Sequence, residues 1–167
     1  MAPLTFQLHE NQEKAYRALV ARVDYGCEHG TLCLVGDFLS GKTTLVKRLL
    51  AEKFKASADD YYVNLNLYLL GELDKQNPSL IHSGAKAKTR ILMQIAIEDL
   101  MQSHFQERAL IVLDAIEATY PYELNLVSIT NRFARDGKLC IICVPESLTH
   151  HYRFDWSWGL AEVIRIT

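Results

Sequence analysis

Short runs of apolar residues, separated by amphipathic segments with a helical period, make up the pattern of this chain. A short continuous apolar run is typical of a strand that is buried on both faces. Such runs predict strands over residues 31–35, 109–114 and 139–144, and a final strand is predicted over residues 162–166. Residues 60–69 instead alternate between apolar and polar positions, with Val63, Leu65 and Leu67 on one side, and this alternation predicts a further strand.

The segments between these strands repeat their apolar residues roughly every three to four positions, as α-helices do. We predict helices over residues 10–27, 42–54, 84–105 and 122–135. The long alanine-rich helix is expected to turn a broad apolar face inward, formed by Ile91, Leu92, Ile95 and Ile97. The segment 71–83 is expected to be a short helix or a loop. Strands that alternate with helices predict an α/β fold with three layers, in which a five-stranded, mainly parallel sheet carries helices on both faces.

The length of 167 residues suits one domain over residues 1–167, with the helix 10–27 leading into its core and no separate lid domain. A net charge of -2 gives no general affinity for nucleic acid or for anionic lipid. No apolar run reaches the ~18 residues that a membrane-spanning helix needs. The N-terminus lacks the basic start and apolar core of a secretory signal. We therefore expect a cytoplasmic protein without membrane association.

Four cysteines are present, and two of them, Cys140 and Cys143, have the spacing of metal and redox sites. They lie within a predicted strand, in which side chains three positions apart point to opposite faces. One metal ion cannot take both thiolates from such a strand. We interpret the cysteines as structural and expect a reducing compartment.

The segment after the first predicted strand carries the pattern G-x-x-x-x-G-K-[ST], which is typical of a phosphate-binding (Walker A) loop between a strand and a helix. Its glycines let the backbone curl, so that its N–H groups and the helix N-terminus face an anion. Lys42 is expected to reach the β- and γ-phosphates of a nucleotide, and the Thr43 hydroxyl to ligate Mg²⁺. The predicted nucleotide-binding residues are Gly36, Asp37, Phe38, Leu39, Ser40, Gly41, Lys42, Thr43 and Thr44.

A second motif follows the strand predicted over residues 109–114, where four apolar residues run into Asp114. This is the form of a Walker B strand, whose terminal aspartate holds the Mg²⁺ shell. At the carboxyl end of a parallel strand, Asp114 is expected to share a crevice with the loop. The water-activating residue is less clear, because Asp114 is followed by Ala115 and not by glutamate. Glu117 is the candidate if a turn over the site begins there, and an ordinary surface glutamate fits the same position.

Arginines near the end of the fourth predicted helix, Arg132 and Arg135, are candidates for an arginine finger that reaches the γ-phosphate of a neighbouring copy. Three positions apart on a helix, they are expected to share one face. Arg153 is a further candidate. Solvated surface side chains are the alternative interpretation of all three.

The loop GDFLSGKT, the segment YYVNLNLYL, the segment LDAIE and the segment CIICVPESL together resemble the BrxF-type proteins, small single-domain P-loop ATPases of BREX phage-defence systems. The resemblance covers nearly the whole chain, which is also similar to the broader additional-strand (AAA-like) class. It implies a P-loop NTPase fold, ATP and Mg²⁺ as cofactors, and an accessory ATPase in a multi-protein complex that restricts phage DNA. Indirect association with DNA would follow from such a complex. One departure is Ala115, where the family usually has asparagine.

Three functions fit the sequence. The first is a weak Mg²⁺-dependent ATPase, or an ATP-controlled assembly subunit, that forms homo-oligomers or joins larger protein partners. The second is a module that binds ATP without turnover, which Ala115 beside Asp114 would explain. The third is a small-molecule or nucleotide kinase. Such kinases need a mobile lid rich in arginine, whereas the candidate segment 71–90 holds one arginine and three lysines.

Overall fold

Five parallel strands form one sheet in the order β2-β3-β4-β1-β5. The computed structural model describes residues 7–26, 30–76, 86–147 and 161–167. The strands are β1 (Thr31–Gly36), β2 (Tyr62–Asn64), β3 (Leu110–Asp114), β4 (Leu139–Pro145) and β5 (Glu162–Arg165). The predicted α/β architecture and the five strands are confirmed, and every pair of neighbours is parallel.

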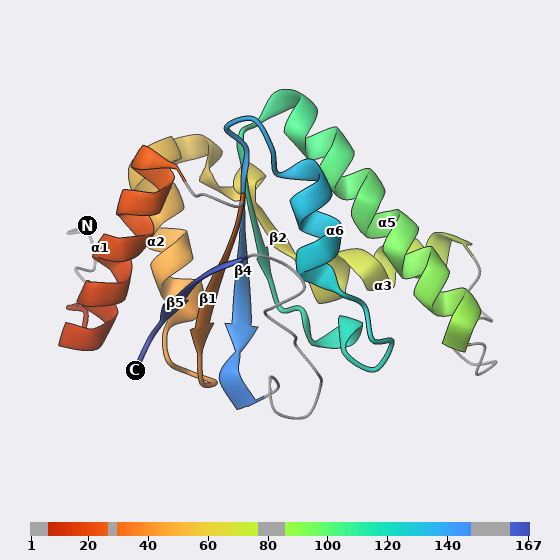
Figure 1. The fold of residues 1–167 in the computed structure, drawn as a ribbon, viewed down its shortest axis with the longest axis horizontal. Coiled ribbons are helices and arrows are strands. Elements are labelled where there is room, and N and C mark those ends of the chain that lie inside the picture. Colours follow the sequence, from red (N-terminus) through yellow and green to blue (C-terminus); the bar gives the residue numbers. More distant parts are fainter. Residues whose placement is uncertain (1–6, 27–29, 77–85, 148–160) are drawn as a thin grey trace.

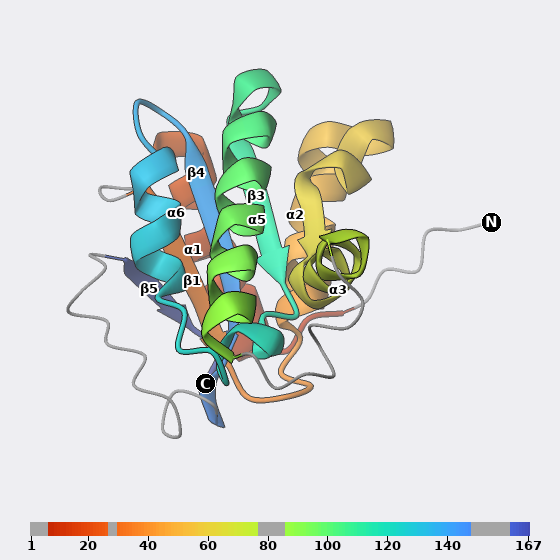
Figure 2. The same ribbon diagram turned by 90° about the vertical axis from the view of Figure 1, so that its right-hand side faces the viewer.

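Helices cover both faces of this sheet (Figure 1). The helices are α1 (Glu10–Tyr25), α2 (Lys42–Phe54), α3 (Leu65–Gln76), α5 (Lys86–Glu107) and α6 (Leu126–Phe133), and two 3₁₀ turns are η1 (Lys55–Tyr61) and η2 (Glu117–Thr119). Helices α1 and α2 lie on one face, whereas α3, α5 and α6 lie on the other, with α5 between its two neighbours (Figure 2). The predicted arrangement in three layers is therefore confirmed.

Burial of the central strands explains why their sequences are continuous apolar runs. Strands β1, β3 and β4 are buried along their whole length, so that both of their faces need apolar side chains. Alternate residues of β1 join the two cores: Leu32 and Leu34 pack with α1 and α2, and Cys33 and Val35 pack with α3, α5 and α6. Hydrophobic burial on both sides fixes the position of β1, and with it the start of the loop that follows.

Cysteines on β4 follow the same alternation. Cys140 belongs to the core under α5 and α6, and Cys143 belongs to the core under α1 and α2. Both thiols are free and buried, and burial raises the pKa of each. The prediction that the two thiols point to opposite faces is confirmed, and their burial fits the interpretation as structural cysteines.

The strand predicted over residues 60–69 is confirmed only for Tyr62–Asn64, because η1 precedes β2 and α3 follows it. The Asn64 side-chain oxygen accepts a hydrogen bond from the Leu67 N–H, and such a side-chain cap starts α3 at this point. Leu65 and Leu69 are then buried at helical spacing, while Leu67 is exposed. Asn64 therefore lies in β2 and Asn66 in α3.

Within α5, the predicted inward face is partly wrong. Ile97 is buried and Leu92 is half-buried, but Ile91 and Ile95 are exposed. Apolar residues occur all around this helix, so its sequence period does not select one side.

None of the described helices is long and apolar enough to cross a membrane.

His104 near the end of α5 makes the stability of this fold sensitive to pH. Its Nε2 lies 2.6 Å from the Leu110 carbonyl oxygen, and its ring contacts Tyr61 and Phe105 edge-on. Burial lowers the pKa of His104, with a smaller contribution from Arg108 in the same direction. Below pH ~6.5 the unfolded chain therefore takes up a proton that the folded chain resists.

We expect the free energy of unfolding to fall as the pH falls below 6.5, the ordinary pKa of histidine. The limiting slope from this one group is about 1.4 kcal/mol per pH unit. In His104→Gln, the side chain still offers a donor to Leu110 but takes up no proton. Urea unfolding at pH 7.5 and 5.5 should show a smaller pH dependence for this variant than for the wild type. Equal pH dependence would contradict the role assigned to His104.

Candidate functional site

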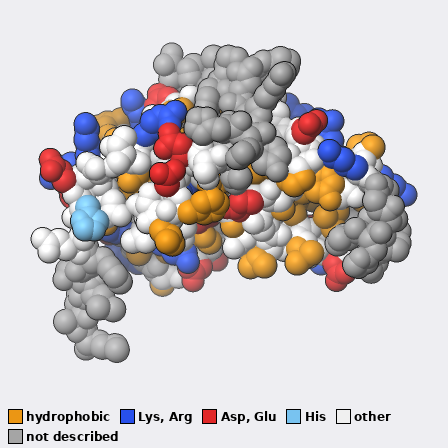
Figure 3. All heavy atoms as spheres, turned by 90° about the horizontal axis from the view of Figure 1, so that it is seen from below, with side chains coloured by type: hydrophobic (Ala, Val, Ile, Leu, Met, Phe, Trp, Pro, Cys, Tyr) orange, Lys and Arg blue, Asp and Glu red, His pale blue; other side chains and the backbone are white. Residues whose placement is uncertain are grey.

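The candidate site lies at the carboxyl ends of the strands, where the loop over residues 37–41 connects β1 to α2 (Figure 1). Figure 3 looks onto this end of the molecule and shows hydrophobic side chains among both acidic and basic ones. A cavity of about 430 Å³ opens here. Its described lining comprises Phe38, Leu39, Gly41, Lys42, Thr43, Thr44, Tyr62, Asn64, Asp114, Ala115, Glu117, Cys143 and Pro145.

Backbone conformation explains the glycines of the β1–α2 loop. Gly41 has φ +97°, a left-handed backbone conformation that residues other than glycine rarely adopt. A Cβ atom there would also come within 2.6 Å of the Gln12 amide nitrogen. A Cβ atom on Gly36 would lie 2.4 Å from the Ser40 hydroxyl oxygen. The backbone conformation of the loop thus requires glycine at position 41, whereas a side chain at position 36 would force the Ser40 side chain to move.

Helix α1 braces the loop through Gln12. The Gln12 Nε2 donates to the Ser40 carbonyl oxygen at 2.9 Å, and its Oε1 accepts from the His9 N–H at 3.1 Å. The amide therefore ties the first turn of α1 to the loop. Gln12 was not predicted as a site residue, because no motif in the sequence of α1 points to the loop.

Lys42 is buried and folds back against the β1–α2 loop. Its ammonium donates to the carbonyl oxygens of Gly36 and Asp37, each at 2.7 Å, and to the Ser40 hydroxyl at 3.4 Å. Burial lowers the pKa of Lys42, and the nearby carboxylates of Asp114, Asp37 and Glu117 act in the opposite direction. A partly desolvated ammonium beside the N-terminus of α2 is well placed to attract a phosphate group.

Asp114, at the end of β3, receives three hydrogen bonds. Its Oδ2 accepts from the Thr43 hydroxyl at 2.6 Å and from the Tyr62 hydroxyl at 2.7 Å. Its Oδ1 accepts from the Ala115 N–H at 2.8 Å. The structure therefore brings Asp114 together with Lys42 and Thr43, although Thr43 and Asp114 are 71 residues apart in the sequence. Burial and the bond to Asp114 raise the pKa of Tyr62, so that its hydroxyl stays protonated and donates.

Glu117 begins η2 and lines the same cavity, so that a turn does start over the site at this residue. Its Oε2 accepts from the Asn66 Nδ2 at 2.8 Å. The Asn66 Oδ1 in turn accepts from the Ala118 N–H at 2.8 Å, and the Asn66 N–H donates to the Ala115 carbonyl at 2.9 Å. Asn66 thus holds both the turn and the carboxylate of Glu117.

The donor set at the cavity suits Mg²⁺. A hydroxyl and a carboxylate oxygen lie side by side in Thr43 and Asp114, and Mg²⁺ prefers such oxygen ligands together with water and substrate phosphates. Within the described residues, no cluster of three or more histidine, cysteine or carboxylate side chains is arranged to enclose a metal.

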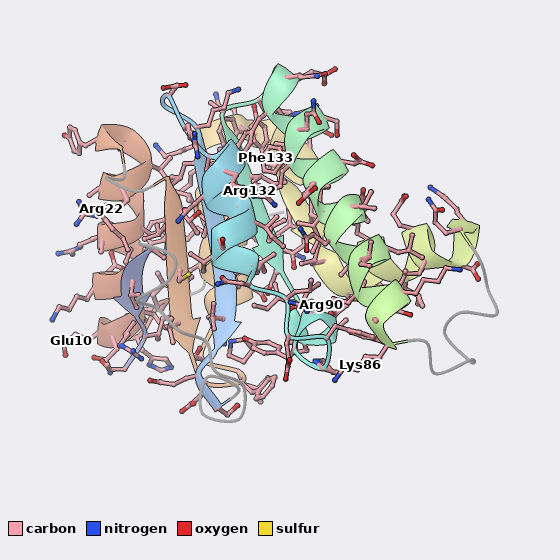
Figure 4. The ribbon with its side chains drawn as sticks, turned by 45° about the vertical axis from the view of Figure 1, so that its right-hand side comes forward. Glu10, Arg22, Lys86, Arg90, Arg132 and Phe133 are labelled. Atoms are coloured by element: carbon pink, nitrogen blue, oxygen red, sulfur yellow. The ribbon has the colours of Figure 1, made fainter. Side chains whose placement is uncertain are left out.

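Arg132 and Arg135 do not join the site of their own chain, and a contact with the site of a neighbouring copy stays a prediction. Arg132 forms an ion pair with Glu98 of α5, and Figure 4 shows it in the part of α6 away from the loop. Arg135 follows the end of α6, so it does not share a helical face with Arg132. It lines a different cavity with Gly30 and Leu139, where β1 and β4 begin. Arg153 lies outside the described residues.

Two residues that the sequence analysis did not assign to the site, Tyr62 and Asn66, complete these contacts. Tyr62 lies on β2, next to β3, with Asn64 opposite Asp114 in the parallel register. Polar side chains near the carboxyl end of a neighbouring strand could have indicated these two residues as part of the site. They were missed because the strand was predicted to continue through Asn66, so its carboxyl end was placed too late in the sequence.

No protein-family profile, no curated protein and no solved structure matches this chain.

Proposed function

We propose that this protein binds ATP together with Mg²⁺, as a weak ATPase or as a subunit whose assembly ATP controls. The observation that carries the proposal is the contact of the Thr43 hydroxyl with the Asp114 carboxylate, beside the Lys42 ammonium and the N-terminus of α2. A phosphate chain with its metal ion needs these groups together: N–H donors, one cation, one hydroxyl and one carboxylate.

Each residue has a distinct part in this proposal. The N–H groups of the loop and of the first turn of α2 would hold the phosphates, and Lys42 would exchange its carbonyl partners for phosphate oxygens. Thr43 and Asp114 would hold Mg²⁺, which neutralises charge on the β- and γ-phosphates when bound. Glu117 would orient a water molecule, and Asn66 would fix its carboxylate.

Strand order supports the broader class to which the sequence is similar. Strand β4 lies between β1, which enters the loop, and β3, which ends in Asp114. An additional strand between these two is the feature that the name of the additional-strand class describes. We extend the proposal, by resemblance to BrxF-type proteins, to a cytoplasmic subunit of a phage-defence complex with protein partners or further copies of itself.

A kinase receives less support from the site. Among the described residues that line the cavity, Lys42 is the one cation and no arginine is present. An enzyme that transfers a phosphoryl group to a small acceptor needs further groups to hold that acceptor. Neither hydrolysis nor binding of ATP requires groups that hold an acceptor.

The test compares ATP binding with phosphate release in wild type and in Glu117→Gln. We expect isothermal titration to show Mg²⁺-dependent ATP binding by both proteins, with dissociation constants within about twofold, because Glu117 is not expected to contact the phosphates. Phosphate release should fall by about 100-fold in the variant, the low end for losing a general base. Glu123→Gln, on an exposed turn, is the matched control.

The outcomes separate the three functions. Absence of ATP binding by the wild type would overturn the proposal. Binding without phosphate release would favour the module that does not hydrolyse ATP. Transfer of labelled phosphate to a small acceptor, without free phosphate, would favour the kinase.

A further inference from the structure

We infer that Tyr62 is a positioning residue for the Mg²⁺ shell, acting through the carboxylate of Asp114. The inference rests on the proposed function and concerns a residue outside both sequence motifs. The Tyr62 hydroxyl lies 2.7 Å from the Asp114 Oδ2, the same oxygen that accepts from Thr43. The contact joins the edge strand β2 to the end of β3.

The register of the sheet places Tyr62 for this contact. Tyr62 pairs with Val112, and Asn64 pairs with Asp114, so the tyrosine lies two positions before the carboxylate. Side chains at alternate positions of a strand share one face. Val112 packs under α2, and Tyr62 packs against the same core, so the hydroxyl is on the side of the sheet where α2 begins.

Contacts around the ring fix its direction. The Lys47 ammonium on α2 lies 4.8 Å from the centre of the Tyr62 ring, which is within the range of a cation–π interaction. The ring is half-buried against the core formed with α1 and α2. A phenylalanine would keep both ring contacts and remove only the hydroxyl, so the hydrogen bond is separable from the packing.

The chemical consequence concerns the orientation of Asp114. Rotation of its carboxylate is restrained at Oδ1 by the Ala115 N–H and at Oδ2 by two hydroxyl groups. In the proposed function, Thr43 is also a ligand of the metal, so its hydroxyl serves two partners. Tyr62 gives Asp114 a hydrogen bond that does not depend on Thr43. Outer partners of this kind typically contribute about 10- to 100-fold to metal affinity.

The experiment measures metal affinity and nucleotide affinity separately in Tyr62→Phe. We expect ATP binding in excess EDTA to stay within about twofold of wild type, since Tyr62 acts through the metal shell. Mn²⁺ binding to the protein–ADP complex, followed by electron paramagnetic resonance, should weaken by about tenfold. Tyr68→Phe is the matched control, because the Tyr68 hydroxyl donates to the Ala96 carbonyl between α3 and α5.

Three results would overturn the inference, and they are distinguishable. Equal Mn²⁺ affinity in Tyr62→Phe and wild type, with nucleotide binding intact, would remove Tyr62 from the metal shell and leave the proposed function standing. Absence of nucleotide binding by the wild type itself would overturn both the inference and the proposed function. A loss of Mn²⁺ affinity in Tyr68→Phe as large as in Tyr62→Phe would also contradict it, because the effect would then not be specific to the contact with Asp114.

Discussion

Replacing Lys42 with methionine is expected to weaken ATP binding by at least about 100-fold. Hydrogen bonds to a charged partner contribute about 1.5–3 kcal/mol each, and Lys42 is placed to make two such bonds to phosphate oxygens. A loss of about 3 kcal/mol corresponds to roughly two orders of magnitude in the dissociation constant. Methionine has a similar length and removes the charge without opening a large cavity.

The same substitution should leave the protein folded, because two effects on stability oppose each other. The carbonyl oxygens of Gly36 and Asp37 lose a donor, which costs about 1–3 kcal/mol where such a group is buried. Burial also lowers the pKa of Lys42, which means that the folded chain holds this ammonium at a cost. Removing the charge recovers part of that cost. The net change in unfolding free energy is therefore expected to stay below about 2 kcal/mol.

Isothermal titration with Mg²⁺-ATP, on protein whose thermal unfolding has been checked, measures the effect. Lys75→Met on α3 is the matched control, because Lys75 is exposed and pairs only with Glu72 among its described contacts. Its ATP affinity should equal that of wild type. Unchanged affinity in Lys42→Met would show that the β1–α2 loop is not the nucleotide site, and an equal loss in both variants would point to a general charge effect.

The sequence predicted the sheet well wherever burial alone decided the structure. The apolar runs of β1, β3 and β4 are buried on both faces, and their positions were confirmed to within one residue at each end. Strand β2 was predicted to be too long, because the side chain of Asn64 caps the helix that follows and the strand ends there. Val63, Leu65 and Leu67 satisfy the period of a strand, and burial of Leu65 and Leu69 in a helix was decided by tertiary packing.

The candidate site shows the same division between local and tertiary information. The loop residues and Lys42 are contiguous, so their pattern can be read directly from the sequence. Asp114 was predicted from the end of a strand, where parallel strands place side chains in a common crevice. Gln12, Tyr62 and Asn66 come from three other elements, and no spacing in the sequence connects them with the loop.

Replacing Gly30 with alanine is expected to destabilise the fold by about 3 kcal/mol or more, since two penalties combine at this residue. Gly30 has φ +78°, which costs an ordinary residue about 1–2 kcal/mol. A Cβ atom there would lie 1.8 Å from the Ala134 carbonyl oxygen and 2.9 Å from its carbon. Both are backbone atoms, so no side chain can rotate away. The Gly30 carbonyl also accepts from the Cys140 N–H, which ties this residue to the start of β4.

Gly137→Ala separates the two penalties. Gly137 has φ +84°, nearly the same backbone conformation, but a Cβ atom there would meet nothing within 4 Å. This variant should lose only the conformational term, about 1–2 kcal/mol. Urea unfolding of both variants beside the wild type gives the steric contribution at Gly30 as the difference between them. Equal losses would mean that the chain at Ala134 moves aside at little cost, and that the contact of α6 with the start of β1 is not rigid. A larger loss at Gly30 would identify this contact as one that holds β1 in place, and the β1–α2 loop begins at the other end of that strand.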